Sequence, residues 1–242
     1  MLVTERKLPL SGGAEKRSYV RAMFTQIAPR YDLLNHVLSL NLDRRWRRQA
    51  VAQLGWERVP AGRYLDLCTG TLDLAATLGG RTGFTGTVVG ADFVLPMLGL
   101  GRGKCDRVKP VNADALDLPF PNASFDGATV GFGVRNLADL DRGLVEAARV
   151  LRPGGRLVIL EFTTPSWQPM RGAYFFYFRR ILPLIGRLVS RHSDAYTYLP
   201  ESVLTFPEPP QLAARMTASG FSHVGWQLLL GGICAIHVGT RR

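Results

Sequence analysis

Three aspartates stand at the ends of three short apolar runs, where carboxylates can bind a ligand. Asp66 lies in RYLDLC, Asp92 ends GTVVGAD and Asp114 ends RVKPVNAD. If these runs are parallel strands, the aspartates share the sheet edge at which open α/β sheets bind nucleotide-like ligands. Asp92 can accept hydrogen bonds from ribose hydroxyls, and Asp114 can meet an exocyclic amine of adenine. Plainer roles are also open, with Asp92 capping a helix and Asp114 in a turn.

A turn of small residues follows the first run. Its Gly70 lets the backbone approach a ligand closely. A dinucleotide-dependent oxidoreductase would carry G-x-G-x-x-G at this position. The turn CTGTLD, residues 68–73, has one glycine, which counts against that class.

The elements that must hold these residues alternate between strand and helix. Further strands are expected at FDGATVGFG (125–133) and RLVILEF (156–162), with helices at 72–78, 96–104 and 138–151. This alternation predicts a parallel sheet flanked by helices, followed by helix 208–219 and an antiparallel hairpin around Gly231–Gly232. Two helices are expected before the sheet, at 17–28, where Pro29 ends it, and at 37–54.

The bulk composition is that of one α/β domain spanning residues 1–242. The chain is 46% hydrophobic and carries a net charge of +11, which favours an anionic partner such as nucleic acid or an acidic membrane surface. The longest apolar run, Leu228–Ile236, is too short to span a bilayer. Three widely spaced cysteines predict a reducing cytoplasm, and four histidines without ligand spacing predict no metal site.

Residues 170–192 (MRGAYFFYFRRILPLIGRLVSRH) interrupt the alternation and are dense in aromatic and arginine residues. They fit either a core-packing helix or an apolar, basic cover that contacts a lipid. We place them in an insertion of about 166–200 that faces lipid or substrate, opposite an N-terminal helical cap of about 17–60.

Three blocks together resemble the ubiquinone/menaquinone biosynthesis C-methyltransferase family. They are YDLLNHVLSLNLDRRWRR (31–48), VGFGVRNLADLDRGLVEAARVLRPGGRLVILEFTTP (130–165), and YTYLPESVLTFPEPPQLAARMTASGF with the later GGICAIHVG. The resemblance covers residues 17–240. It implies a Rossmann-like class I methyltransferase that binds S-adenosylmethionine, with a seven-stranded, mostly parallel sheet whose last strand is antiparallel.

The resemblance also implies site residues. Thr71 and Asp92 would hold the donor near its methionine end and ribose, with Asp114 and Ala115 at the adenine. The substrate pocket would be lined by Tyr31, Asp32, Asn35, Arg135 and Asn136. The substrate would be a polyprenylated quinol, demethylmenaquinol first and a methoxy-benzoquinol of ubiquinone synthesis second. A peripheral contact with the inner face of the membrane and a homodimer are both compatible with this picture, and nucleic acid is not expected as a partner.

Methyl transfer from a sulfonium to carbon is an in-line displacement that needs a nucleophilic ring carbon. A quinol hydroxyl has a pKa of roughly 10, and loss of its proton activates the ortho carbon. The candidate bases are Asp32, His36 and a water held by Arg135 and Asn136. The Arg135 charge could also steady the phenolate.

The chain departs from the family pattern in the turn after the first strand. Thr69 and Leu72 stand where further small residues are usual, and Val94 and Gly131 replace common serines. We expect the bulky Leu72 to crowd the donor. That expectation keeps two alternatives open, a non-catalytic quinone- or lipid-binding relative and, from the charge, a nucleic-acid methyltransferase.

Overall fold

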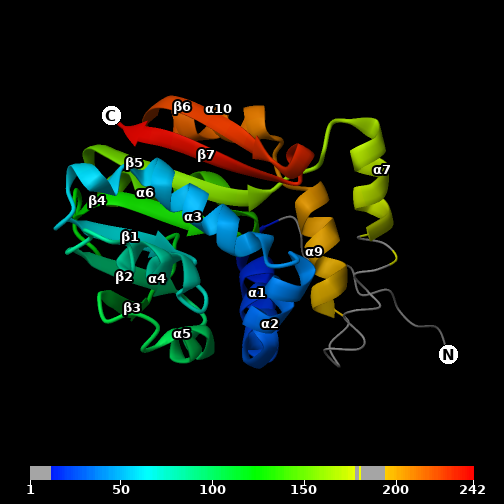
Figure 1. The fold of residues 1–242 in the computed structure, drawn as a ribbon, viewed down its shortest axis with the longest axis horizontal. Coiled ribbons are helices and arrows are strands. Elements are labelled where there is room, and N and C mark those ends of the chain that lie inside the picture. Colours follow the sequence, from blue (N-terminus) through cyan, green and yellow to red (C-terminus); the bar gives the residue numbers. More distant parts are fainter. Residues whose placement is uncertain (1–11, 178–179, 181–193) are drawn as a thin grey trace.

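A seven-stranded sheet forms the centre of the protein, in a computed structural model that describes residues 12–177, 180 and 194–242. The strand order is β3-β2-β1-β4-β5-β7-β6 (Figure 1). The strands are β1 (Arg63–Leu67), β2 (Thr87–Asp92), β3 (Val108–Asn112), β4 (Phe125–Gly131), β5 (Leu151–Phe162), β6 (Phe221–Leu229) and β7 (Cys234–Arg241). Strand β7 is antiparallel to both neighbours and the other pairings are parallel, which confirms the predicted sheet.

The chain order reverses at β1, which pairs with β2 on one side and β4 on the other. Parallel sheets bind ligands outside the carboxyl ends of the strands at such a switch point. Asp66 lies opposite Gly90 and Asp92 opposite Asn112, so the predicted acids reach one edge of the sheet.

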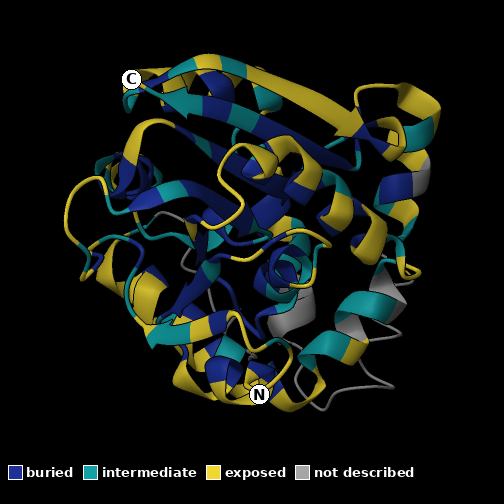
Figure 2. Ribbon diagram, turned by 60° about the vertical axis from the view of Figure 1, so that its left-hand side comes forward, coloured by how far each residue is buried: buried dark blue, intermediate teal, exposed yellow. Residues whose placement is uncertain are grey.

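Helices cover both faces of the sheet. On one face lie α3 (Leu42–Leu54), α4 (Asp73–Gly79) and α5 (Leu95–Gly101), packed in a cluster with Val88 and Val158. On the other lie α6 (Leu140–Val150) and α10 (Pro209–Ala218), packed in a cluster with Phe125 and Ile159. The central strands β1, β2 and β4 are largely buried, whereas the edge strand β6 is mainly exposed (Figure 2).

The N-terminal helices begin beyond the carboxyl ends of the strands, beside α9 (Asp194–Leu204) (Figure 1). Helix α1 (Gly13–Ile27) ends before the short 3₁₀ turn η1 (Ala28–Arg30), as Pro29 predicts. The prediction of a single helix at 37–54 is wrong. The chain instead forms two helices, α2 (Tyr31–Leu38) and α3. Between them, Leu40 and Asn41 adopt left-handed φ values of 51° and 61°, at which an α-helix cannot continue.

The aromatic segment 170–192 is described only in part. Its first residues belong to α7 (Gln168–Phe176), whereas 178–179 and 181–193 lie outside the described residues. Its interpretation as a lipid-facing cover therefore stays a prediction. None of the described helices is long and apolar enough to cross a membrane.

Candidate active site

The loop between β1 and α4 is shaped by residues in the left-handed region. Cys68, Gly70 and Leu72 have φ of 51°, 56° and 67°. The Gly70 N–H donates to Asp92 Oδ2 at 2.8 Å, which fixes the loop against the end of β2. A Cβ at Gly70 would lie 3.4 Å from Met97 Cε and 3.6 Å from the Tyr31 ring. Glycine thus keeps this stretch of backbone accessible.

Asp66 lies beneath this loop and is fully buried. Its carboxylate accepts hydrogen bonds from the hydroxyls of Thr69 and Thr129 and from the Ala75 N–H, the last at 3.1 Å. Burial raises the pKa of Asp66 to about 6, although these hydrogen bonds oppose the shift. The structure therefore places Asp66 as an anchor of the loop and of α4, away from the cavity described next.

A cavity of about 670 Å³, partly open to solvent, lies at the strand ends between the sheet and α1. We call it the strand-end cavity. Six of the predicted site residues line it: Tyr31, Gly70, Asp92, Asp114, Ala115 and Asn136. Helix α1 closes the other side with Arg17, Val20 and Phe24. The structure thus brings together side chains far apart in the chain, as the strand-end positions predict.

Asp114 has the turn role that the sequence left open, but Asp92 does not cap α5, whose N-cap residue is Val94 and has no side-chain cap. The Asp92 oxygens accept from the N–H groups of Gly70 and Val94, each at 2.8 Å, and burial raises its pKa. Asp114 accepts from the Leu116 N–H at 3.0 Å and forms an ion pair with Arg17 of α1 at 2.6 Å. A carboxylate oxygen has more than one acceptor site, so both acids can still bind a ligand in the cavity.

Leu72 does not crowd the donor site, so that expectation is wrong. Its side chain is 1% exposed, belongs to the core on the α3–α5 face and is absent from the lining of the strand-end cavity. A Cβ at Gly90 would come within 2.4 Å of Leu72 Cδ2, and one at Gly101 within 2.7 Å of its Cγ. These two glycines make room for the leucine inside the core.

A second cavity, of about 800 Å³ and also partly open, lies among α1, α2, α3 and α9. We call it the helical cavity. Its lining is mainly apolar and aromatic, and it includes the predicted Asn35 and Arg135. Phe24, Tyr31 and Phe132 line both cavities. A molecule in one cavity would therefore adjoin a molecule in the other across these three side chains.

Arg135 is held at this junction by a buried ion pair. It lies in the 3₁₀ turn η3 (Val134–Asn136), and its Nη1 donates to Glu161 Oε1 and to the Phe132 carbonyl, each at 2.6 Å. Burial alone would lower the pKa of Arg135, but Glu161 outweighs it and the net pKa is raised. Arg135 Nε and Asn136 Oδ1 have no partner in the described part of the chain. Sequence reasoning missed Glu161, although a charge inside the apolar run LVILEF was a usable signal.

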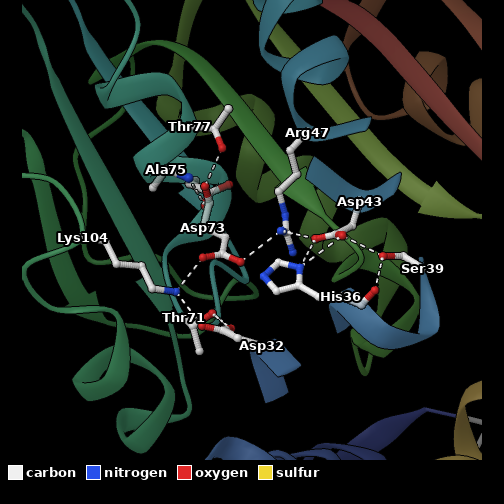
Figure 3. Close-up of polar contacts among 11 residues, drawn as sticks. Asp32, His36, Ser39, Asp43, Arg47, Thr71, Asp73, Ala75, Thr77 and Lys104 are labelled. Atoms are coloured by element: carbon white, nitrogen blue, oxygen red, sulfur yellow. Dashed lines mark hydrogen bonds and ion pairs between the residues drawn. The ribbon is translucent and has the colours of Figure 1, made fainter. Parts of the chain in front are cut away.

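Asp32 faces the loop after β1 and lines neither cavity. It accepts from Thr71 Oγ1 at 2.5 Å and from Lys104 Nζ at 2.7 Å, and Lys104 also donates to Asp73 at 2.6 Å (Figure 3). Thr71 is thereby tied to α2. The geometry gives Asp32 the role of a clamp on the loop, and its role as a base stays a prediction without support from its position.

The same network continues into α3. Arg47 Nη1 lies 2.6 Å from Asp43 and 3.0 Å from Asp73, and His36 Nδ1 lies 3.0 Å from Asp43 (Figure 3). Burial would raise the pKa of Asp43, but hydrogen bonding from Ser39 and the charge of Arg47 lower it overall. Asp43 and Arg47 line the helical cavity, and the i,i+4 spacing within DRRWR was the signal for them.

Solved structures share this fold at low sequence identity. A S-adenosylmethionine-dependent methyltransferase from Thermotoga maritima aligns with a TM-score of 0.64 and 19% identity, covering 92% of this chain and 100% of its own. The [4+2]-cyclase SpnF aligns with a TM-score of 0.66 and 17% identity, covering 92% and 95%. The protein thus has the Rossmann-like class I methyltransferase fold, which a cyclase also adopts.

The model of the ubiE/COQ5 methyltransferase family matches residues 13–241, and the chain belongs to this family. A relative named demethylmenaquinone methyltransferase, from Thermus thermophilus, is 52% identical over 90% of this chain and all of its own. One of the same name from Deinococcus radiodurans is 47% identical over the whole of both chains. A ubiquinone/menaquinone biosynthesis C-methyltransferase from Citrifermentans bemidjiense is 46% identical over 94% and 98%. The predicted family and the prediction of a methyltransferase are confirmed.

Proposed function

We propose that this enzyme transfers a methyl group from S-adenosylmethionine to a ring carbon of demethylmenaquinol. The observation that carries the proposal is the meeting of two cavities at Tyr31 and Phe132, one edged by strand-end acids and one mainly apolar. Bisubstrate transfer without a covalent intermediate needs such adjoining sites. The names of the Thermus and Deinococcus relatives support this substrate over a methoxy-benzoquinol.

The strand-end cavity suits the donor. Asp92, which lines the cavity, would accept from the ribose hydroxyls, and Asp114 and Ala115 would lie beside the adenine. Gly70 allows close approach, and Thr71, fixed by Asp32, would lie near the methionine end. S-adenosylmethionine supplies a methyl group on a sulfonium, which is a good leaving group, so the protein has mainly to align it.

The helical cavity suits a reduced aromatic ring. The guanidinium of Arg135 stays charged and would stabilise a phenolate oxygen next to the reacting carbon. Asn136 lines the adjoining strand-end cavity, and its Oδ1 is buried and unpaired within the described residues, so it can orient a water between the two cavities that takes the quinol proton. Tyr31 and Asn35 would position the ring from α2.

A prenyl tail must leave the site towards an apolar phase. Trp167, Phe176 and Leu230 are 65%, 62% and 50% exposed around α7 and the β6–β7 turn. We propose that this region touches the membrane surface peripherally, assisted by the positive charge of the chain. Co-sedimentation with liposomes that ignores anionic lipid content would contradict the electrostatic part of this contact.

The decisive experiment supplies labelled S-adenosylmethionine and a short-chain demethylmenaquinol kept reduced. We expect label on the ring carbon, with the oxidised quinone inert as the matched control. Faster transfer to a methoxy-benzoquinol would move the substrate to the ubiquinone series. Donor binding by calorimetry without transfer to either quinol would overturn the proposal.

A further inference from the structure

Tyr198 of α9 carries a buried hydroxyl that the described structure leaves unpaired. The side chain is 2% exposed and lines the helical cavity. Its ring is held against Tyr19 of α1, with centroids 5.5 Å apart, and packs in a cluster with Val20 and Met23. A buried hydroxyl without a partner destabilises a fold, so its retention at a cavity wall points to a ligand that pairs with it.

A second unpaired donor lines the same cavity. Arg135 Nε is buried and has no partner among the described residues, while its Nη1 is engaged by Glu161. Burial raises the pKa of Tyr198 to about 12, against a lowering influence of Arg135, so the hydroxyl remains protonated at neutral pH. Both groups are donors under working conditions. A mainly apolar cavity with two unpaired donors fits an aromatic ring that bears two oxygen acceptors.

The two donors lie on different elements, Arg135 in η3 and Tyr198 in α9. Phe132, Gly133 and Asn136, which flank Arg135 in the chain, all line the strand-end cavity. Leu199, beside Tyr198, lines only the helical cavity. Arg135 is thus adjacent in the chain to residues of the strand-end cavity, whereas Tyr198 reaches the helical cavity from a separate helix.

We propose that Tyr198 determines substrate specificity by donating a hydrogen bond to the quinol oxygen that is not adjacent to the methylated carbon. Arg135 then donates to the quinol oxygen that is adjacent to the methylated carbon. This inference rests on the proposed function and extends it from a substrate class to the recognition of a 1,4-diol. A ring with a single hydroxyl would keep its activated carbon but leave the Tyr198 hydroxyl unpaired.

The first test compares Tyr198→Phe with Tyr64→Phe. The Tyr64 hydroxyl is buried and paired, donating to the carbonyls of Val59 at 3.0 Å and Trp56 at 3.3 Å, far from either cavity. We expect Tyr64→Phe to lower Tm with kcat/KM unchanged. Tyr198→Phe should keep or raise Tm in the free protein, because it removes an unpaired group, and should lower kcat/KM for the diol roughly tenfold.

The second test uses a prenylated 1-naphthol that keeps the hydroxyl next to the reacting carbon and carries hydrogen at the other position. The wild type should prefer the diol by roughly tenfold, and Tyr198→Phe should lose that preference. An equal loss on both substrates, or a fall in Tm with an unchanged preference, would overturn the inference. Wild-type protein that transfers no methyl group refutes the proposed function instead. In that case, the rise in Tm caused by each compound still reports whether Tyr198 distinguishes them.

Discussion

Substitutions of Leu72 test whether its side chain belongs to the core or to the donor site. The residue lies in the loop between β1 and α4, which we call the donor loop. The side chain is 1% exposed, and truncating a leucine so buried costs about 2–5 kcal/mol. Its φ of 67° is a conformation that costs a residue with a Cβ about 1 kcal/mol and costs glycine little. Leu72→Ala keeps that strain and Leu72→Gly relieves it. We therefore expect both variants to lose about 3 kcal/mol, with glycine no worse than alanine.

Leu78 is the matched control. It is also 1% exposed, packs in the same core cluster and lies inside α4 with no positive φ. Leu78→Gly should be less stable than Leu78→Ala by about 1 kcal/mol, because glycine has a lower helix propensity than alanine. Urea unfolding would give the free energies, and the Leu72 variants should melt about 10 °C below the wild type. Calorimetry below the transition should show their donor affinity unchanged, because the side chain points away from the strand-end cavity.

Two results would refute this account of Leu72. The first is Leu72→Gly with a wild-type Tm and tighter donor binding, which would place the side chain in the donor site after all. The second is a Leu72→Gly variant that is less stable than Leu72→Ala by the same margin as the corresponding Leu78 variants. That result would mean that φ at position 72 is not positive. The first outcome would also restore the expectation that Leu72 crowds the donor.

Three further predictions concern charged groups around the site. Lys104→Met removes the ion pairs of Lys104 with Asp73 and with Asp32, the residue that holds Thr71 in the donor loop. Calorimetry should therefore show weaker donor binding, and the free energy of unfolding should fall by about 1 kcal/mol or less. Asp66, with a folded pKa of about 6, binds its proton before the unfolded chain does, so its contribution to stability grows as pH falls from about 6 to about 4. Asp66→Asn should remove up to about 3 kcal/mol of that pH dependence in urea unfolding. Glu161→Gln leaves the buried Arg135 charge unpaired, so it should cost about 3 kcal/mol in unfolding free energy and reduce turnover of the quinol.

Several strands were predictable because they are short apolar runs bounded by turn signals, but β5 begins at Leu151 and not at Arg156, since it continues through RPGG with a register shift against β4. Such runs at 63–68, 86–92 and 125–133 became β1, β2 and β4 within one or two residues of their expected ends. The helix expected at 37–54 failed for a local reason. Leu40 continues the apolar pattern through the break, so its residue type does not indicate its left-handed φ of 51°.

The strand-end half of the site was predictable and the helical half less so. Parallel pairing alone brings the ends of β1, β2 and β3 to one edge, so Asp92 and Asp114 could be placed from spacing. The side chains that hold the site residues in position lie far from them in the sequence. Lys104 reaches Asp32 across 72 residues and Arg135 reaches Glu161 across 26, and no local pattern encodes either distance.

Most residues that line the helical cavity come from helices and not from the sheet. SpnF shares the fold at a TM-score of 0.66 and is a cyclase, so the fold alone does not determine the reaction. The apolar second cavity is built chiefly from α1, α2, α3 and α9, and Arg135 reaches it from the loop after β4. Two of the three motif blocks, 31–48 and the one that begins at Tyr196, supply residues of α2, α3 and α9. Two of the three blocks that carry the family resemblance thus supply helices that line the helical cavity.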